Sequence, residues 1–158
     1  MCIPDGRQID IEDLSDWELF SNCKGSFLGY NISMLNLLAI FIGGGIGSLL
    51  RYGLTISSVR FFAFPLWGTF TANMIGCLVI GFVGGIISTH SLSLSSATRL
   101  FITVGLLGGL TTFSTLNLEA WELIRLGKIS WAIGYLLISS FLGLLLASLG
   151  YFISTYIS

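Results

Sequence analysis

Charged side chains are scarce in this chain of 158 residues: Asp, Glu, Lys and Arg together make up only 9% of the sequence. Soluble domains carry about 25% charged residues. Hydrophobic residues account for 54%, and the mean hydropathy is +0.90. A soluble domain of this size could not bury so much apolar surface. The composition therefore excludes an ordinary soluble domain and predicts that lipid surrounds most of the chain.

Other shortages narrow the possible functions. The sequence has no cluster of Lys or Arg, which argues against nucleic-acid binding. The three cysteines, Cys2, Cys23 and Cys77, have neither the spacing of a metal site nor that of a redox pair. The single histidine, His90, stands beside a serine-rich stretch and is predicted to be a loop residue rather than a ligand. No nucleophile–base pair or carboxylate dyad is evident either, so we do not expect an enzyme.

Long apolar runs, in contrast, are abundant. A membrane-spanning helix needs about 20 mostly apolar residues. The sequence contains four such segments: Leu35–Ile56, Trp67–Ser88, Leu100–Leu118 and Trp131–Tyr156. Their connections are short and cover residues 57–66, 89–99 and 119–130. Residues 34–158 are therefore predicted to form one all-α unit of four transmembrane helices, which leaves no room for a soluble catalytic domain.

The first 33 residues differ from the rest in charge. They contain six acidic and two basic residues, whereas residues 34–158 contain two acidic and five basic residues. This acidic segment is expected to be a disordered tail, with a folded cap as the alternative. It does not resemble a signal peptide. Met34 directly precedes the apolar run. A second alternative is therefore that the first 33 residues are an extension that arises from start-site choice or cloning. The few loop charges do not decide the orientation of the helices in the membrane.

The 20 glycines indicate close packing of helices. Gly43 with Gly47, and Gly81 with Gly85, have the small-xxx-small spacing that allows two helix backbones to approach each other. We therefore expect these four glycines to lie at contacts between helices.

The segment from Gly105 to Glu119, GLLGGLTTFSTLNLE, is unusual for the middle of a membrane helix. The adjacent glycines Gly108 and Gly109 give backbone freedom, and the hydroxyl side chains after them compete for backbone hydrogen bonds. We therefore predict that the third helix is broken here, with a simple kink as the alternative. Freed carbonyl oxygens inside a membrane must be buried in protein or face water, and they can bind a small hard cation.

Polar side chains in the predicted spans suggest a pathway for a small anion. Asn73, Ser114 and Thr115 supply neutral hydrogen-bond donors, and the ring of Phe113 has an electropositive edge. No cationic side chain stands among them, so an anion could pass without being trapped. Polar groups buried in membranes are costly and often mark pathways. For Asn73 the alternative is a hydrogen bond between helices.

Three motifs in order resemble the CrcB/Fluc family of fluoride channels. They are GGGIGSLLRY at residues 43–52, GTFTANMIG at residues 68–76 and GLLGGLTTFST at residues 105–115. The resemblance covers nearly all of residues 34–158. It implies a multi-pass protein of the inner (plasma) membrane through which fluoride leaves the cytoplasm passively. It also implies an antiparallel, dual-topology homodimer with two fluoride pores and a sodium ion (Na⁺) at its centre.

The same resemblance assigns residues to these sites. The fluoride pore is assigned to side chains on three spans: Asn73, Phe113, Ser114, Thr115, Leu116 and Tyr135. The central Na⁺ is assigned to backbone carbonyl oxygens of Gly108 and Thr111.

Leu116 departs from the family and leaves two assemblies open. The family has a second phenylalanine at this position, three residues after Phe113. Leucine keeps the bulk of that side chain but lacks the electropositive ring edge. Either Phe113 suffices and a homodimer conducts through both pores, or this chain is a half-active or non-conducting subunit of a heterodimer with a paralogue. A membrane enzyme finds the least support.

Overall fold

The computed structural model describes residues 33–62, 66–89 and 94–157, whose regular structure is helical throughout. The elements are α2 (Met34–Phe62), α3 (Leu66–Ser88), α4 (Ser96–Leu100), the π-helix η2 (Phe101–Leu107), α5 (Gly108–Leu110), α6 (Phe113–Arg125) and α7 (Ile129–Ile157). The predicted tail at residues 1–33, Ser33 excepted, and the predicted loop residue His90 lie outside the described residues.

Four helical segments within the described ranges are long and apolar enough to cross a membrane. They are Met34–Phe61, Leu66–Ser88, Ser96–Arg125 and Ile129–Ile157. The predicted all-α unit of four transmembrane helices is thereby confirmed. The third span runs through α4, η2, α5 and α6, and it continues past its predicted end at Leu118 to Arg125.

A tight turn between α6 and α7 accounts for this longer third span. Gly127 has a φ of 74°, a left-handed conformation that glycine adopts without steric cost. Its N–H donates to the Ile124 carbonyl at 2.9 Å, and the N–H of Lys128 donates to the Leu123 carbonyl at 2.9 Å. These two bonds form a Schellman motif, which ends a helix abruptly. The connection predicted over residues 119–130 is therefore only residues 126–128.

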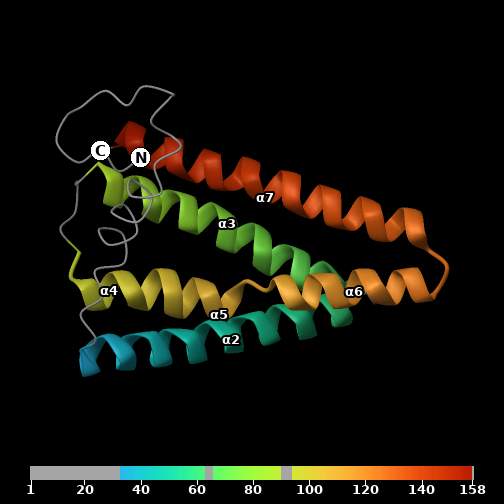
Figure 1. Ribbon diagram of the computed structural model, residues 1–158, viewed down its shortest axis with the longest axis horizontal. Helices are drawn as coiled ribbons and strands as arrows, with labels where there is room; N and C mark the ends of the chain where they lie inside the picture. The colour runs from blue at the N-terminus through green and yellow to red at the C-terminus, as the bar shows by residue number, and fades with distance from the viewer. Residues whose placement is uncertain (1–32, 63–65, 90–93, 158) are drawn as a thin grey trace, which may run out of the picture. The chain divides into compact units, whose positions relative to one another are not determined.

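The helices pack in two close pairs through their glycines. Helix α3 packs along α7, and α2 packs along η2 and α5 (Figure 1). A Cβ atom on Gly43 or Gly47 would overlap backbone atoms of η2, and one on Gly81 or Gly85 would overlap atoms of α7. The predicted role of these four glycines at helix contacts is confirmed.

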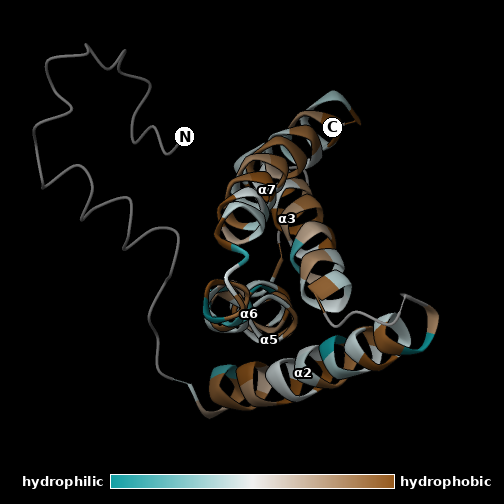
Figure 2. Ribbon diagram, turned by 90° about the vertical axis from the view of Figure 1, so that its right-hand side faces the viewer, coloured by the Kyte–Doolittle hydropathy of each residue, from teal (hydrophilic) through white to brown (hydrophobic). Residues whose placement is uncertain are grey.

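Most large apolar side chains of these helices point outward rather than into a core. Figure 2 shows hydrophobic residues around the circumference of α2, α3 and α7. The buried hydrophobic cluster is small and centres on Ala72, Leu107 and Leu110. In water each square ångström of exposed apolar surface would cost about 25 cal/mol. Lipid removes that cost, so the outward apolar surface fits a helix unit embedded in a membrane.

Candidate functional site at the break in the third helix

The third helix is interrupted at two residues, Thr111 and Thr112. Their backbone angles are extended, with φ/ψ of −81°/153° and −152°/121°. Figure 1 shows the interruption as a thin coil between α5 and α6. The predicted break is therefore present, but it follows Gly108 and Gly109, which are themselves helical.

The side chain of Asn73, on the neighbouring helix α3, pairs with the backbone at the break. Its Nδ2 donates to the Thr112 carbonyl at 3.1 Å, and its Oδ1 accepts from the Thr112 N–H at 2.8 Å. In a continuous α-helix that N–H would bond to the Gly108 carbonyl. The amide of Asn73 thus replaces a helix hydrogen bond. This explains why the break falls at Thr112 rather than at the glycines.

Two carbonyl oxygens lose their usual helical donors as a result. The Gly108 oxygen loses the Thr112 N–H, which bonds to Asn73 instead. The Thr111 oxygen would be paired with the Thr115 N–H, but that group donates to Thr112 Oγ1 at 3.2 Å. Gly108 is exposed and Thr111 is half-buried. These two residues were predicted to bind a cation, and carbonyl oxygens without helical donors fit a hard ion.

Gly76 makes room for the break. It lies three residues after Asn73, so both residues are on the same side of α3. A Cβ atom on Gly76 would overlap the methyl group of Thr111. Sequence reasoning gave Gly76 no role of its own, although the motif at residues 68–76 includes both Asn73 and Gly76.

Hydroxyl groups gather where helix α6 begins. Thr112 Oγ1 accepts the Thr115 N–H as the N-cap and lies 3.2 Å from Ser114 Oγ and 3.1 Å from Thr115 Oγ1. Ser114 is exposed and Thr115 is half-buried. The first turn of this 13-residue helix contains no acidic residue. Because a helix N-terminus carries partial positive charge, this end of α6 suits an anion.

Phe113 and Leu116 have opposite environments. The Phe113 side chain is 77% exposed, whereas Leu116 is 6% exposed. Within one chain the two residues therefore do not line a common wall. The exposed ring of Phe113, beside the break, is available for contact with lipid or with a second subunit.

A carboxylate missed by sequence reasoning joins three helices. Glu119 Oε1 accepts a 2.6 Å hydrogen bond from the hydroxyl of Thr69, which is 2% exposed, and Glu119 Oε2 accepts one of 2.7 Å from the Tyr135 hydroxyl. The Tyr135 hydroxyl also lies 3.5 Å from the Leu66 carbonyl. The predicted pore residue Tyr135 thus directs its proton to Glu119. The sequence did contain a signal for Glu119 in its spacing. Glu119 is four residues after Thr115, so a third helix that continues past Leu118 puts both residues on one face.

Ser139 is a further buried polar group on α7. It is 5% exposed, and its Oγ has no hydrogen-bond partner among the described residues. It lies four residues after Tyr135 and so shares that residue's helix face. A buried hydroxyl without a partner costs free energy, which makes Ser139 a candidate contact for a passing ion.

Three pairs of polar residues, each four positions apart, lie on the mutually packed helices α3, α6 and α7. They are Thr69 and Asn73, Thr115 and Glu119, and Tyr135 and Ser139. We call these six residues the polar seam. Hydrogen bonds through Glu119 connect its three helices, and the pairing of Asn73 with Thr112 connects it to the break. The seam contains hydroxyl, amide and carboxylate groups but neither Lys nor Arg.

Comparison with known proteins places this arrangement in a family. Residues 38–151 match the family described as CrcB-like protein, Camphor Resistance (CrcB). A protein of Desulfotalea psychrophila named fluoride-specific ion channel FluC is 40% identical over 77% of this chain and 93% of its own length. Proteins of the same name from Phocaeicola vulgatus and Chloroflexus aurantiacus are 43% and 44% identical, over 77% and 74% of this chain and 99% and 93% of their own lengths. The chain therefore belongs to the CrcB-like family.

Proposed function

We propose that this chain forms a fluoride-selective passive ion channel in the plasma membrane. The observation that carries the proposal is the break paired with Asn73, which adjoins the polar seam and the hydroxyl-rich start of α6. Family membership supports it, since the similar proteins are named fluoride-specific ion channels. The channel would let fluoride leave the cytoplasm and so reduce fluoride toxicity.

The chemistry of the donors suits fluoride. Fluoride is small and holds water tightly, so a path through the membrane must offer closely spaced donors in place of that water. One Nδ2 hydrogen of Asn73 remains after its bond to Thr112, because an amide nitrogen has two hydrogens. The hydroxyls of Ser114 and Ser139 are further donors. Hydrogen bonds between neutral donors and an ion are weaker than an ion pair with Arg, so the ion can leave again.

Glu119 affects which hydroxyls an anion can use. In the described arrangement the protons of Thr69 and Tyr135 both point to its carboxylate. These two donors are therefore occupied, and both oxygens of the half-buried carboxylate have a hydrogen-bond partner. We expect Glu119 to shape the seam as a positioning residue rather than to bind fluoride.

The proposal is tested in liposomes that contain only this protein. We expect them to release fluoride and retain chloride, because a larger and more weakly hydrated anion gains less from closely spaced donors. Efflux is measured with ion-selective electrodes, and protein-free liposomes serve as the control. Equal fluoride and chloride efflux would refute selectivity. No fluoride efflux from the pure protein, restored by adding a paralogous subunit, would instead support the heterodimer.

We further propose that the working unit is an antiparallel homodimer with Na⁺ at its centre. The carbonyl oxygens of Gly108 and Thr111 have lost their helical donors, and two chains related by a twofold axis would present four such oxygens. When bound, Na⁺ would neutralise the negative ends of these apposed carbonyl dipoles. The exposed Phe113 ring beside the break supports a second subunit at this face.

The buried position of Leu116 supports the homodimer over a heterodimer. Leu116 packs inside its own chain, whereas Phe113 is the ring that a partner could contact. The departure from the family at Leu116 therefore alters the interior rather than this exposed face.

Removal of sodium tests the central ion. We expect fluoride efflux to fall when N-methylglucamine replaces Na⁺ on both sides throughout purification and reconstitution, because the apposed carbonyls would repel one another. Readdition of Na⁺ should restore efflux, whereas the larger Cs⁺ should not. Unchanged efflux without sodium, or a density map with an unbroken helix through Gly108–Thr111, would contradict the proposal.

A further inference from the structure

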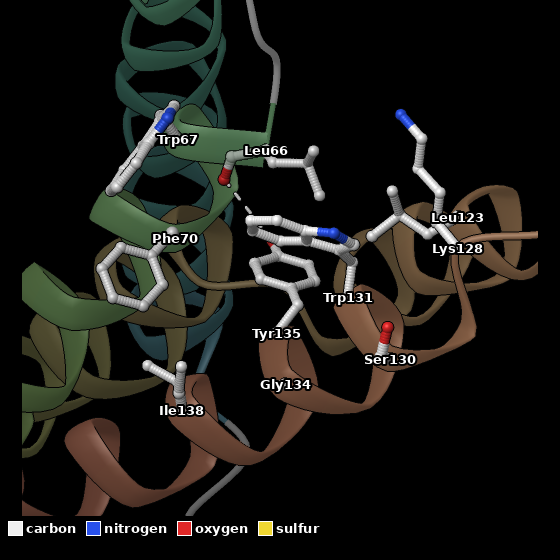
Figure 3. A pocket seen from close by; sticks show the side chains of 10 residues that line it. All are labelled: Leu66, Trp67, Phe70, Leu123, Lys128, Ser130, Trp131, Gly134, Tyr135 and Ile138. Atoms are coloured by element: carbon white, nitrogen blue, oxygen red, sulfur yellow. Dashed lines mark hydrogen bonds between the residues drawn. The ribbon is translucent and has the colours of Figure 1, made fainter.

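A cleft with a volume of about 790 Å³ lies beside the polar seam, where three spans begin or end. Its walls come from the start of α3, the end of α6 and the start of α7, with Trp67, Phe70, Leu123, Lys128, Trp131 and Ile138 among them (Figure 3). The volume is within the range of roughly 300–1,000 Å³ that is usual for ligand pockets. The cleft is therefore large enough to hold part of a small molecule or a lipid.

Tyr135 separates this cleft from the polar seam. Its ring forms part of the cleft wall, but its hydroxyl is directed to Glu119 and to the Leu66 carbonyl (Figure 3). The polar end of Tyr135 thus belongs to the seam and its apolar ring belongs to the cleft. Of the six seam residues, Tyr135 is the one that the cleft shares.

One end of the cleft is positively charged. Among the described residues that line the cleft, Lys128 is the only charged one, and Ser130 adds a hydroxyl group nearby (Figure 3). The Schellman motif of Gly127 and Lys128 fixes the backbone at this position. Helix α7, which is 29 residues long, begins at Ile129, so the positive end of its dipole lies beside the lysine. The rest of the lining is apolar and aromatic.

We propose that this cleft binds an anionic phospholipid. The phosphate would lie against Lys128 and the first turn of α7, and an acyl chain would run along Trp67, Phe70 and Ile138. Three features select this occupant: the cleft is at the ends of membrane spans, tryptophan rings favour the lipid headgroup level, and basic pockets between membrane helices bind anionic headgroups. The inference depends on the membrane location of the chain and not on fluoride conduction.

The chain offers variants that change the cleft without disturbing the backbone. Gly134 lines the cleft, and a Cβ atom there would have no atom within 4 Å, so Gly134→Leu should extend a side chain into the cleft from an open position. Gly53→Leu is the matched control, because Gly53 on α2 is equally open and does not line the cleft. Lys128→Gln removes the charge. Arg125→Gln removes a nearby exposed charge that does not line the cleft.

The experiment is native mass spectrometry of the full, delipidated chain titrated with dioleoyl phosphatidylglycerol or dioleoyl phosphatidylcholine. We expect phosphatidylglycerol to bind about fivefold more tightly, which is the effect of roughly one basic side chain at a lipid surface. Lys128→Gln should remove this preference, and Gly134→Leu should weaken binding of both lipids. Both control variants should bind like the parent.

Several results would overturn the proposal. Equal binding of the two lipids by the parent would show that the charge of Lys128 does not select the headgroup. Unchanged phosphatidylglycerol binding by both Lys128→Gln and Gly134→Leu would place the lipid elsewhere. A change in subunit number with Gly134→Leu, without a change in lipid binding, would show that protein rather than lipid covers the cleft. Fluoride efflux, measured separately, does not enter this comparison.

Discussion

Asn73→Asp is expected to reduce fluoride efflux by about tenfold or more while the protein still folds. The aspartate can still accept the Thr112 N–H, but it cannot donate to the Thr112 carbonyl as Asn73 does. Two oxygens would then face each other, at a cost of about 1–3 kcal/mol for the lost buried hydrogen bond. A negative charge beside the path would also repel fluoride. Since each 1.4 kcal/mol is a factor of ten in an equilibrium constant, the combined effect should be large.

The measurement is fluoride efflux from liposomes at matched protein density, with folding and assembly checked by size-exclusion chromatography. Asn117→Asp is the matched control. Asn117 is exposed on α6, and its amide donates to the Phe113 carbonyl within the same helix, so the control adds the same charge and also loses an amide donor but leaves the pairing of Asn73 with Thr112 intact. We expect a much smaller loss from it. Failed assembly of Asn73→Asp would indicate a packing role for Asn73. Normal efflux from a folded variant would show that Asn73 does not lie on the fluoride path.

The transmembrane architecture could be predicted because hydropathy acts over whole segments. Each span needs only enough consecutive apolar residues, and four such runs are evident in the sequence. The contacts of Gly43 and Gly81 could also be predicted, because small residues at a spacing of four form a groove on a helix wherever it lies.

The position of the break could not be predicted from the third span alone. Two glycines make a helix easy to interrupt, but the partner that holds the interruption is Asn73, 39 positions before Thr112. Without that amide, nothing in the local sequence favours Thr112 over Gly109. The long-range hydrogen bonds therefore determine where the backbone leaves the helix.

Glu119 was missed for a related reason. A carboxylate directly after an apolar run is normally a sign that the run has left the membrane. Here helix α6 continues to Arg125, and hydroxyl groups from two other helices, 50 and 16 positions away, bond to the carboxylate. Burial of a charged or polar group is acceptable when its hydrogen bonds are satisfied. Only the folded arrangement brings those donors together.

Phe113→Leu is expected to reduce fluoride efflux about fivefold, and Leu116→Phe is expected to change it much less. The two side chains have different environments, since Phe113 is 77% exposed beside the break and Leu116 is 6% exposed inside the chain. An electropositive ring edge is worth about 1 kcal/mol, and Phe113 supplies the ring of this pair. Its replacement by leucine keeps the bulk of the side chain and removes that edge.

Leu116→Phe adds a ring where the chain has little space. Overpacking of this kind costs about 1–3 kcal/mol of folding free energy, so the variant should lose thermal stability while its remaining folded fraction conducts nearly as well as the parent. The two variants therefore separate conduction from packing. Phe113→Leu should lower efflux without much effect on the stability of the single chain, whereas Leu116→Phe should lower stability first. Efflux is compared at matched density of folded protein, with thermal melting of each variant alongside.

If Phe113→Leu conducts like the parent, the exposed ring serves packing between subunits rather than the ion. If Leu116→Phe instead increases efflux severalfold, the buried position reaches the path, and the missing second phenylalanine limits conduction in this chain.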